Sequence, residues 1–347
     1  MATISGIQGM LLEEALLFLL EISGYRVVYS ASVDPHTLHD GHSGLEVLGR
    51  GGKHQIDAVA DYILAHPFSN PQRLLVEAKC YSDSRPVNIE IVRNAVGVLK
   101  DVSEFWVTGI PRPANNRYHY QYAVFSASGY TADAQGYAYA QDIYLIPLEK
   151  SQYIAPLIAK IRQLSHLDFG ATSKGQININ MKNLRTAVRK TIRDLQSSAL
   201  EEIDLTSQAV DKLHDFCLDC NRMQGAILAM IADRFPVFLI PAPNINIREL
   251  SNRYDVRITR DEQGWYLSDD RSRLFSFDLP RDLFDMYAEN GLLTKSRALD
   301  LKRESLNSIH ALITIGESTQ AVTFELDQQW LSQVRQPIGT IRRRRRR

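Results

Sequence analysis

Three charged side chains in the first third of the chain have the types and spacing that metal-assisted hydrolysis requires. Asp57 ends the segment Gln55-Ile56-Asp57, and Glu77 and Lys79 follow in Glu77-Ala78-Lys79. Because side chains alternate across a strand, Glu77 and Lys79 share one face, and Gln55 and Asp57 share a face of another strand. Two adjacent strands would therefore bring Asp57, Glu77 and Lys79 around one point.

Two neighbouring carboxylates repel each other unless a cation compensates them. Hard oxygen ligands select Mg²⁺, for which Mn²⁺ can substitute. Such an ion activates water and stabilises charge on a phosphate, and a nearby lysine can orient or deprotonate that water. The pattern predicts a site that hydrolyses phosphodiester bonds, with Gln55 orienting Asp57 or a metal-bound water. The alternative is an ordinary charged strand, but Glu77 follows the apolar run Leu74-Leu75-Val76, where an unused charge is costly.

The segments around these residues alternate between helical and strand patterns. We expect helices over residues 8–23, 88–102 and 131–142, strands over 25–30, 55–63, 74–79, 120–126 and 143–147, and a long exposed loop over 31–53. This order predicts one α/β domain over residues 1–165. Residues 166–235 follow as a linker and a helical segment. Residues 236–347 are expected to form an α+β domain for recognition, regulation or oligomerisation, ending in an arginine-rich tail.

Several segments in the same order resemble the Mrr-like (type IV) restriction endonucleases of the PD-(D/E)xK nuclease superfamily. The resemblance covers about residues 8–148. It rests on Gly24-Tyr25, Gly49-Arg50-Gly51-Gly52 before Gln55-Ile56-Asp57, Val76 to Tyr81, Pro86-Val87, Val92 to Leu99, and Phe125 to Thr131 with Ala134. It implies a restriction-endonuclease-like mixed sheet flanked by helices. It also implies Mg²⁺-dependent cleavage of DNA that leaves 5′-phosphates, in prokaryotic restriction or anti-phage defence.

The resemblance also implies roles for individual residues. The family has a glutamate in its first helix, eleven residues before the glycine of the Gly-Tyr pair, and Glu13 stands at that position. Glu14 is the alternative, about 100° further around the helix. This glutamate would help to hold a second metal ion or its water. Asp57, Glu77 and Glu13 are thus the implied metal ligands, and Lys79 would position the attacking water.

Three basic segments could contact nucleic acid, and each has a plainer interpretation. Arg50 and Lys53 belong to a glycine-rich loop that could approach a DNA phosphate or could simply be flexible. The basic helix around Lys182 to Arg193 could follow a phosphate backbone or could be a solvated face. The run Arg342 to Arg347 could bind DNA without sequence preference or could be a disordered tail.

The composition limits the class of protein. The chain has 347 residues, 44% of them hydrophobic, which excludes a wholly disordered chain and a collagen-like fibre. Lys and Arg balance Asp and Glu at 40 each, but without Arg342 to Arg347 the remainder carries a net charge of −6, so nucleic acid would be met by local patches. Three cysteines fit a reducing compartment, and Cys217 and Cys220 read as neighbours on a helix rather than as a zinc site. With no apolar run long enough to cross a membrane, we expect a soluble, cytoplasmic protein.

Three functions remain open from the sequence. The first is a Mg²⁺-dependent DNA endonuclease that works as a homo-oligomer. The second is a nuclease effector gated by a defence-system partner protein, or by an infection signal that the C-terminal part senses. The third is a non-catalytic DNA-binding protein on a nuclease fold. The complete set of Asp57, Glu77 and Lys79 argues against the third, because a binding protein has no need of a costly carboxylate cluster.

Overall fold

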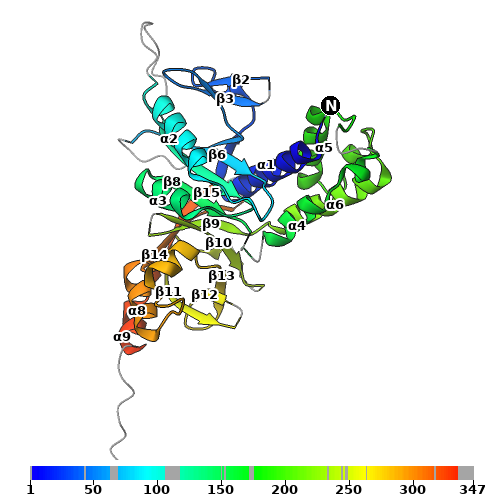
Figure 1. The fold of residues 1–347 in the computed structure, drawn as a ribbon. Helices are drawn as coiled ribbons and strands as arrows, with labels where there is room; N and C mark the ends of the chain where they lie inside the picture. Colours follow the sequence, from blue (N-terminus) through cyan, green and yellow to red (C-terminus); the bar gives the residue numbers. More distant parts are fainter. Residues whose placement is uncertain are drawn as a thin grey trace, which may run out of the picture. The chain divides into compact units, whose positions relative to one another are not determined.

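The chain forms two compact units, Met1–Ala226 and Ile227–Arg347. The structure is a computed structural model that describes residues 2–42, 44–62, 69–105, 118–149, 151, 154–171, 176–232, 234–243, 245–246, 249–262, 264–315 and 318–334. The arginine-rich tail lies outside these residues. The fold is mixed α/β, with helices and several sheets, as expected (Figure 1).

A five-stranded mixed sheet forms the centre of the first unit, in the order β1-β5-β6-β7-β8. Its strands are β1 (Tyr25–Val28), β5 (Ala58–Tyr62), β6 (Gln72–Lys79), β7 (His119–Ser126) and β8 (Ile143–Pro147). Strands β1, β5 and β6 are antiparallel, whereas β6, β7 and β8 are parallel. Parallel neighbours need crossover connections. Helices α2 (Ile89–Ser103) and α3 (Ala132–Ala140) lie in these two connections.

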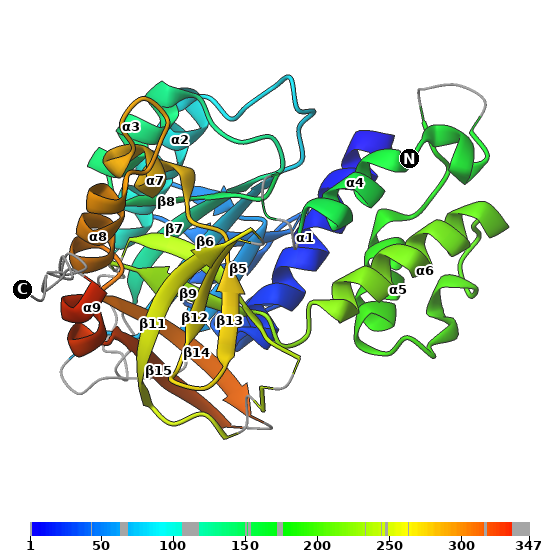
Figure 2. The same cartoon turned by 90° about the horizontal axis from the view of Figure 1, so that it is seen from below.

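Helix α1 (Ile4–Ile22) lies between this sheet and a group of helices. It contacts β1, β5 and β6, and it also contacts α4 (Ala155–Gln163) and α5 (Met181–Arg193). Leucines on several sides of α1 are buried as a result, among them Leu11, Leu12, Leu16 and Leu19. Helix α6 (Ser207–Arg222) packs against α4 and α5 (Figure 2). Of residues 166–235, expected as a linker and a helical segment, residues 166–226 belong to the unit that contains α1 and the sheet.

The region predicted as a long exposed loop contains a second sheet, so that prediction was wrong. Strands β2 (Leu38–Asp40), β3 (Leu45–Leu48) and β4 (Lys53–Gln55) pair in order. Leu38 and Val47 are buried in the same apolar cluster as Val59 and Leu75 of the main sheet. The strands are three or four residues long and interrupted by polar turns, so their alternation is too short to be distinguished from a loop.

The second unit is a closed seven-stranded barrel, in the order β10-β13-β12-β11-β15-β14-β9. Figure 2 labels most of these strands. Its strands are β9 (Ile227–Ile231), β10 (Phe235–Pro241), β11 (Arg253–Asp261), β12 (Gly264–Ser268), β13 (Arg273–Phe277), β14 (Ser308–Ile315) and β15 (Ser318–Leu326). Helices α7 (Arg281–Tyr287), α8 (Lys295–Glu304) and α9 (Gln328–Val334) complete it. The mixture of helices and strands was predicted, but closure into a barrel was not. Strand β9 was predicted to be helical because a short apolar run such as Ile227–Ile231 fits both structures.

Candidate functional site

The register of the main sheet places Asp57 and Glu77 across from each other. Strands β5 and β6 are antiparallel, with Ala58 opposite Val76. One further step along this register puts Asp57, the residue before β5, opposite Glu77. Directly opposite residues project from the same face, with Cβ atoms about 4.5–5.5 Å apart. The backbone N–H of Ala78 donates to Asp57 Oδ2 at 2.8 Å and holds this carboxylate at the strand end.

Glu77 and Lys79 lie on one face of β6, as the sequence predicts. The Lys79 ammonium forms an ion pair with Glu77 Oε1. The hydroxyl of Tyr122 on β7 donates to the other oxygen, Glu77 Oε2, at 3.1 Å. Both oxygens of Glu77 therefore have hydrogen-bond donors. Tyr122 was not among the predicted site residues, since a tyrosine within an apolar strand reads as core.

The electrostatics of the cluster show that its negative charge is incompletely balanced. Burial, followed by the charges of Glu77 and Glu13, raises the pKa of Asp57 from 3.8 to about 7. Burial alone would lower the pKa of Lys79, but Glu77 and Asp57 outweigh it and raise that pKa. Lys79 is therefore a cation at neutral pH. The three carboxylates of Asp57, Glu77 and Glu13 outnumber the two cations beside them, Lys79 and Arg185, and a bound cation would relieve this excess of negative charge.

Glu13 and Glu14 of α1 have different surroundings. Glu13 interacts electrostatically with the sheet carboxylates. Its charge contributes to the raised pKa of Asp57, and the charge of Glu77 contributes to the raised pKa of Glu13. Burial is the largest cause of the raised pKa of Glu13, and Arg185 opposes it. Arg185 Nη2 donates to Glu13 Oε2 at 2.5 Å. Glu13 is thus the α1 carboxylate whose charge reaches the cluster.

Glu14 is held in an ion-pair network with α5 instead. It is only 1% exposed. Arg189 donates to both of its oxygens, from Nε at 2.8 Å and from Nη2 at 2.7 Å. Arg185 Nη1 adds a third bond at 3.1 Å. Buried charges persist when they are paired in this way, so Glu14 has a structural role between α1 and α5.

The prediction that Gln55 and Asp57 lie on one strand was wrong. The two residues do not share a strand: Gln55 ends β4, whereas Asp57 precedes β5 in the other sheet. The side chain of Gln55 is exposed, and its register partner is Glu46 on β3. Between them, Ile56 packs into the same buried cluster as Val59 and Leu75. The chain changes sheets here within an alternating pattern that reads as one continuous strand.

The glycine-rich loop is anchored to the end of α2. Its turn closes with a bond from Gly49 N–H to the Gly52 carbonyl at 2.7 Å. Asp101 accepts from Gly51 N–H and pairs with the His54 ring, each at 2.8 Å. A Cβ atom at Gly49 would lie 2.0 Å from Asp101 Oδ2, so a larger residue there would push aside the carboxylate that anchors the turn.

The two basic side chains of this loop remain accessible. Arg50 is 69% exposed, and its guanidinium lies 2.9 Å from Glu104. Lys53 is exposed on β4. An anchored turn can present such side chains to a phosphate at low conformational cost. Asp101, which holds the turn, was missed because it is distant in sequence and lies in a helical pattern.

Three arginines of the basic helix α5 fit neither of its predicted interpretations, whereas Lys182 and Lys190 are exposed. Arg185, Arg189 and Arg193 recur every four residues and so form one stripe. All three pair with carboxylates of α1, with Arg193 bonded to Glu21 at 2.5 Å through Nη2. This stripe is an interface between two helices rather than a solvated or DNA-facing surface.

The oxygen atoms of the site suit a divalent cation chemically. The sheet, however, supplies only two carboxylates for it, Asp57 and Glu77. Among the residues that the structure describes, no group of three or more His, Cys, Asp or Glu side chains could hold a metal ion. Asp57 and Glu77 provide the hard oxygens that Mg²⁺ or Mn²⁺ prefers. Glu13, the third predicted ligand, is bonded to Arg185 instead.

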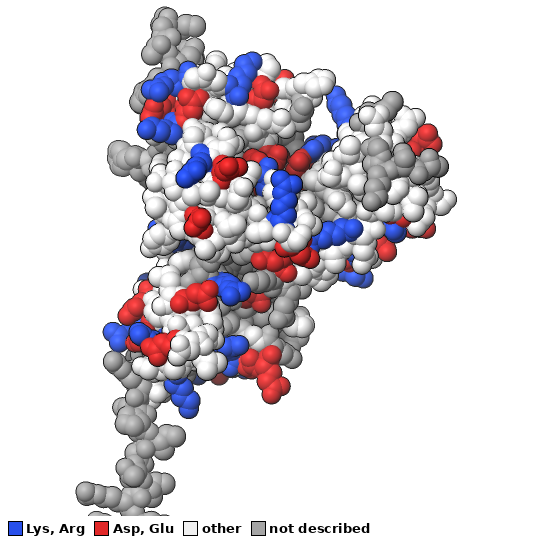
Figure 3. Space-filling model, in the orientation of Figure 1, with Lys and Arg blue, Asp and Glu red and all other residues white. Residues whose placement is uncertain are grey.

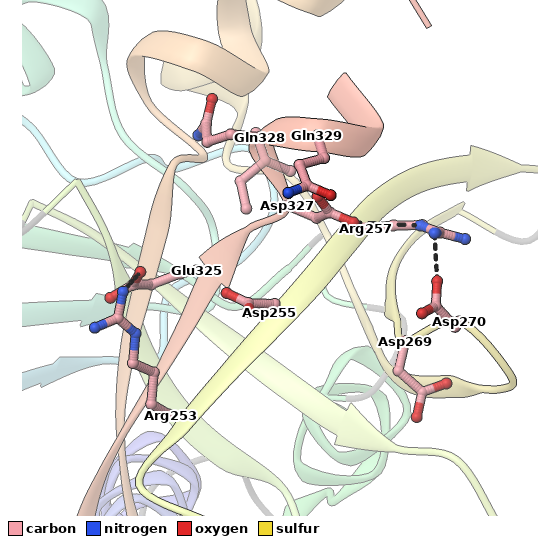
Figure 4. Close-up of a pocket in the computed structure, with 10 residues that line it drawn as sticks. Arg253, Asp255, Arg257, Asp269, Asp270, Glu325, Asp327, Gln328 and Gln329 are labelled. Carbon is pink, nitrogen blue, oxygen red and sulfur yellow. Dashed lines mark hydrogen bonds and ion pairs between the residues drawn. The ribbon is translucent and has the colours of Figure 1, made fainter. Parts of the chain in front are cut away.

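The barrel unit has a separate pocket of about 490 Å³ that contains none of the predicted site residues (Figure 4). Its two arginines are paired: Arg253 with Glu325, and Arg257 with Asp270. Five acidic side chains line it, including Asp255 and Asp327. This net negative charge is unsuited to a phosphate group.

Comparison with known proteins adds little to this description. No family model and no curated protein matches the chain. A crystal structure of a protein of unknown function, AF1548, is similar with a TM-score of 0.35 and 16% identity, covering 62% of this chain and 98% of that one. A likeness of this size carries no argument about fold or function. None of the helices in the described part of the chain is long and apolar enough to cross a membrane.

Proposed function

We propose that this chain is a metal-dependent endonuclease that hydrolyses DNA phosphodiester bonds, with Asp57, Glu77 and Lys79 as its catalytic residues. The observation that carries the proposal is the placement of Asp57 opposite Glu77, with Lys79 on the same face of β6. Like charges at opposed positions destabilise a sheet. A cation would turn that unfavourable arrangement into a binding site, and Mg²⁺, or Mn²⁺ in its place, suits the two carboxylates.

Each residue then has a definite task. Asp57 and Glu77 would hold the ion, which when bound would activate water and stabilise charge on the phosphate. Because the pKa of Lys79 is raised, its side chain stays protonated. It therefore acts as a donor that orients the attacking water or a phosphate oxygen, and not as the base. Water adds to phosphorus, the bond to the 3′-oxygen breaks, and the products are a 5′-phosphate and a 3′-hydroxyl.

Contact with DNA would come from local features. Lys and Arg are interspersed with Asp and Glu on the face drawn in Figure 3, without one continuous basic field. The exposed Arg50 on the anchored turn and the exposed Lys53 at the start of β4 suit a phosphate contact near Asp57, which follows β4 in the chain. The fold that this proposal implies is the restriction-endonuclease-like one, and the setting is restriction or anti-phage defence.

Cleavage of methylated and unmethylated plasmids tests the proposal directly. The wild type should cut with Mg²⁺ or Mn²⁺ and not with EDTA. Asp57→Ala, Glu77→Ala and Lys79→Ala should each lower the rate by about 10³-fold or more, as expected when transition-state stabilisation is removed. Glu201→Ala, which removes an exposed carboxylate outside the site, should cut like the wild type. Circular dichroism and thermal unfolding check that each variant folds.

The outcomes separate the alternatives. Wild-type rates for Asp57→Ala or Glu77→Ala, or cutting in EDTA, would contradict the assigned site. A difference between the two plasmids would indicate modification-dependent restriction. If the folded wild type cuts neither plasmid, a nuclease gated by a partner or a signal is favoured instead.

A further inference from the structure

One arginine of the α5 stripe differs from the other two. Arg189 is committed to Glu14, and Arg193 to Glu21. Arg185 is shared: Nη2 bonds Glu13 and Nη1 bonds Glu14. It is therefore the arginine that touches the carboxylate whose charge reaches Asp57 and Glu77.

The contact places a permanent cation on Glu13, the carboxylate that the family resemblance assigns to a second metal ion or its water. A guanidinium stays protonated in proteins and donates through fixed N–H groups. Arg185 is about two-thirds buried, at 31% exposed, and its bond to Glu13 measures 2.5 Å. A divalent ion that used Glu13 as a ligand would have to bind beside this permanent cation, whose charge repels it. In the described part of the chain, moreover, no third carboxylate joins the Asp57–Glu77 pair in a metal-binding group.

We propose that the Arg185 guanidinium takes the place of a second metal ion, so that the site binds a single divalent cation at Asp57 and Glu77. Arg185 is then a positioning residue that fixes and neutralises Glu13. This inference rests on the proposed nuclease function. It changes the role that the resemblance assigns to Glu13, from a metal ligand to the anionic partner of a fixed cation.

The stoichiometry of Mn²⁺ binding tests this without DNA. Calorimetric titration, with electron paramagnetic resonance as a second readout, should give one Mn²⁺ per wild-type chain. Arg185→Met should bind two, because Glu13 loses the neighbouring cation that repels a second ion. Arg189→Met is the matched control: it removes the same charge from the same helix face but from Glu14, and it should still bind one. Arg185→Lys keeps a cation near Glu13 and should also bind one.

A second variant keeps the test independent of how well Arg185→Met folds. Glu13→Gln should still bind one Mn²⁺ per chain, because Asp57 and Glu77 hold it. Two ions in the wild type, or one in a folded Arg185→Met, would overturn the role of Arg185 while leaving the nuclease proposal intact. By contrast, no Mn²⁺ in the wild type, or unchanged binding in Asp57→Asn, would overturn the metal site itself.

Discussion

The two ends of one strand pair carry charged residues in opposite arrangements. At one end of the β5–β6 pair, Asp61 lies opposite Arg73, so unlike charges face each other. At the other end the same register brings Asp57 opposite Glu77, so like charges do. The sheet, the strands and the pairing are shared, and only the sign of one partner differs. The end with unlike charges stabilises the fold. The end with like charges lowers stability, and its presence therefore calls for a functional explanation.

The complementary end is fully satisfied. Arg73 is 0% exposed, and it donates to Asp61 from Nε at 2.7 Å and from Nη2 at 3.2 Å. Its Nη1 bonds Asp34 at 3.1 Å and Thr37 at 2.7 Å. Burial would raise the pKa of Asp34, but the bonds from Thr37 and Arg73 outweigh it and lower that pKa. Charges matched in this way stabilise the fold and need no ligand.

The largest effect is expected from breaking the complementary end. Arg73→Met should lower the free energy of unfolding by about 3–5 kcal/mol, because it leaves Asp61 and Asp34 without their buried cation. Urea denaturation measures this loss. Adding Asp61→Asn to Arg73→Met should recover part of this free energy, because it removes one of the two unpaired charges. A loss below about 1 kcal/mol would mean that water reaches this network.

The like-charged end should respond in the opposite direction. Asp57→Asn should raise the free energy of unfolding at pH 8 by roughly 2 kcal/mol, because it removes a carboxylate whose pKa is raised. In the folded protein Asp57 binds its proton up to about pH 7, but in the unfolded chain only up to about pH 4. This group therefore favours folding at low pH, and that contribution is lost as the pH rises through about 7.

The sign of that change can be checked in metal-free buffer. Denaturation of both proteins with EDTA should show the advantage of Asp57→Asn growing from pH 5 to pH 8. Glu77, Glu13 and Lys79 are the charged groups that act on Asp57, so Glu77→Gln should shrink the advantage. An Asp57→Asn variant that is less stable than the wild type at both pH values would show that the carboxylate is well satisfied.

The sequence predicts relations between residues close in the chain better than contacts between distant residues. Alternation along β6 correctly placed Glu77 and Lys79 on one face, since that relation spans two residues. The break at Ile56 was missed because an alternating strand pattern runs through the point where the chain changes sheets. The bond between Arg185 and Glu13 joins residues 172 positions apart, and no local pattern in one sequence reports such a contact.

The barrel illustrates the same limit. Six of its seven strands, all except β9, overlap segments whose side-chain pattern alone predicts a strand. Its closure depends on β11 pairing with β15 in parallel, where the register partners Arg253 and Thr323 lie 70 positions apart in the chain. The alternation of side chains predicts where strands form. Closure of the barrel depends on which strand edges pair, and the sequence does not report this.

A smaller effect is expected from the neutral donor at the like-charged end. Tyr122→Phe removes the hydroxyl that donates to Glu77 and should lower the free energy of unfolding by about 1 kcal/mol. Burial and the charge of Glu77 raise the pKa of Tyr122, so the phenol keeps its proton across the working pH range. Urea denaturation checks the loss. A more stable Tyr122→Phe protein would show that the hydroxyl does not support Glu77.

The smallest effect is expected from the outer arginine at the complementary end. Arg26 bonds Asp61 at 2.9 Å, but its side chain is 63% exposed. Arg26→Met should therefore cost at most about 0.5–1 kcal/mol, and less at high salt, because Asp61 keeps both bonds from Arg73. Denaturation of Arg26→Met and Arg73→Met at low and high salt measures separately what each arginine contributes through Asp61. If Arg26→Met cost as much as Arg73→Met, the balance at this end would come from the whole network, and burial of one cation would no longer explain why this end is structural.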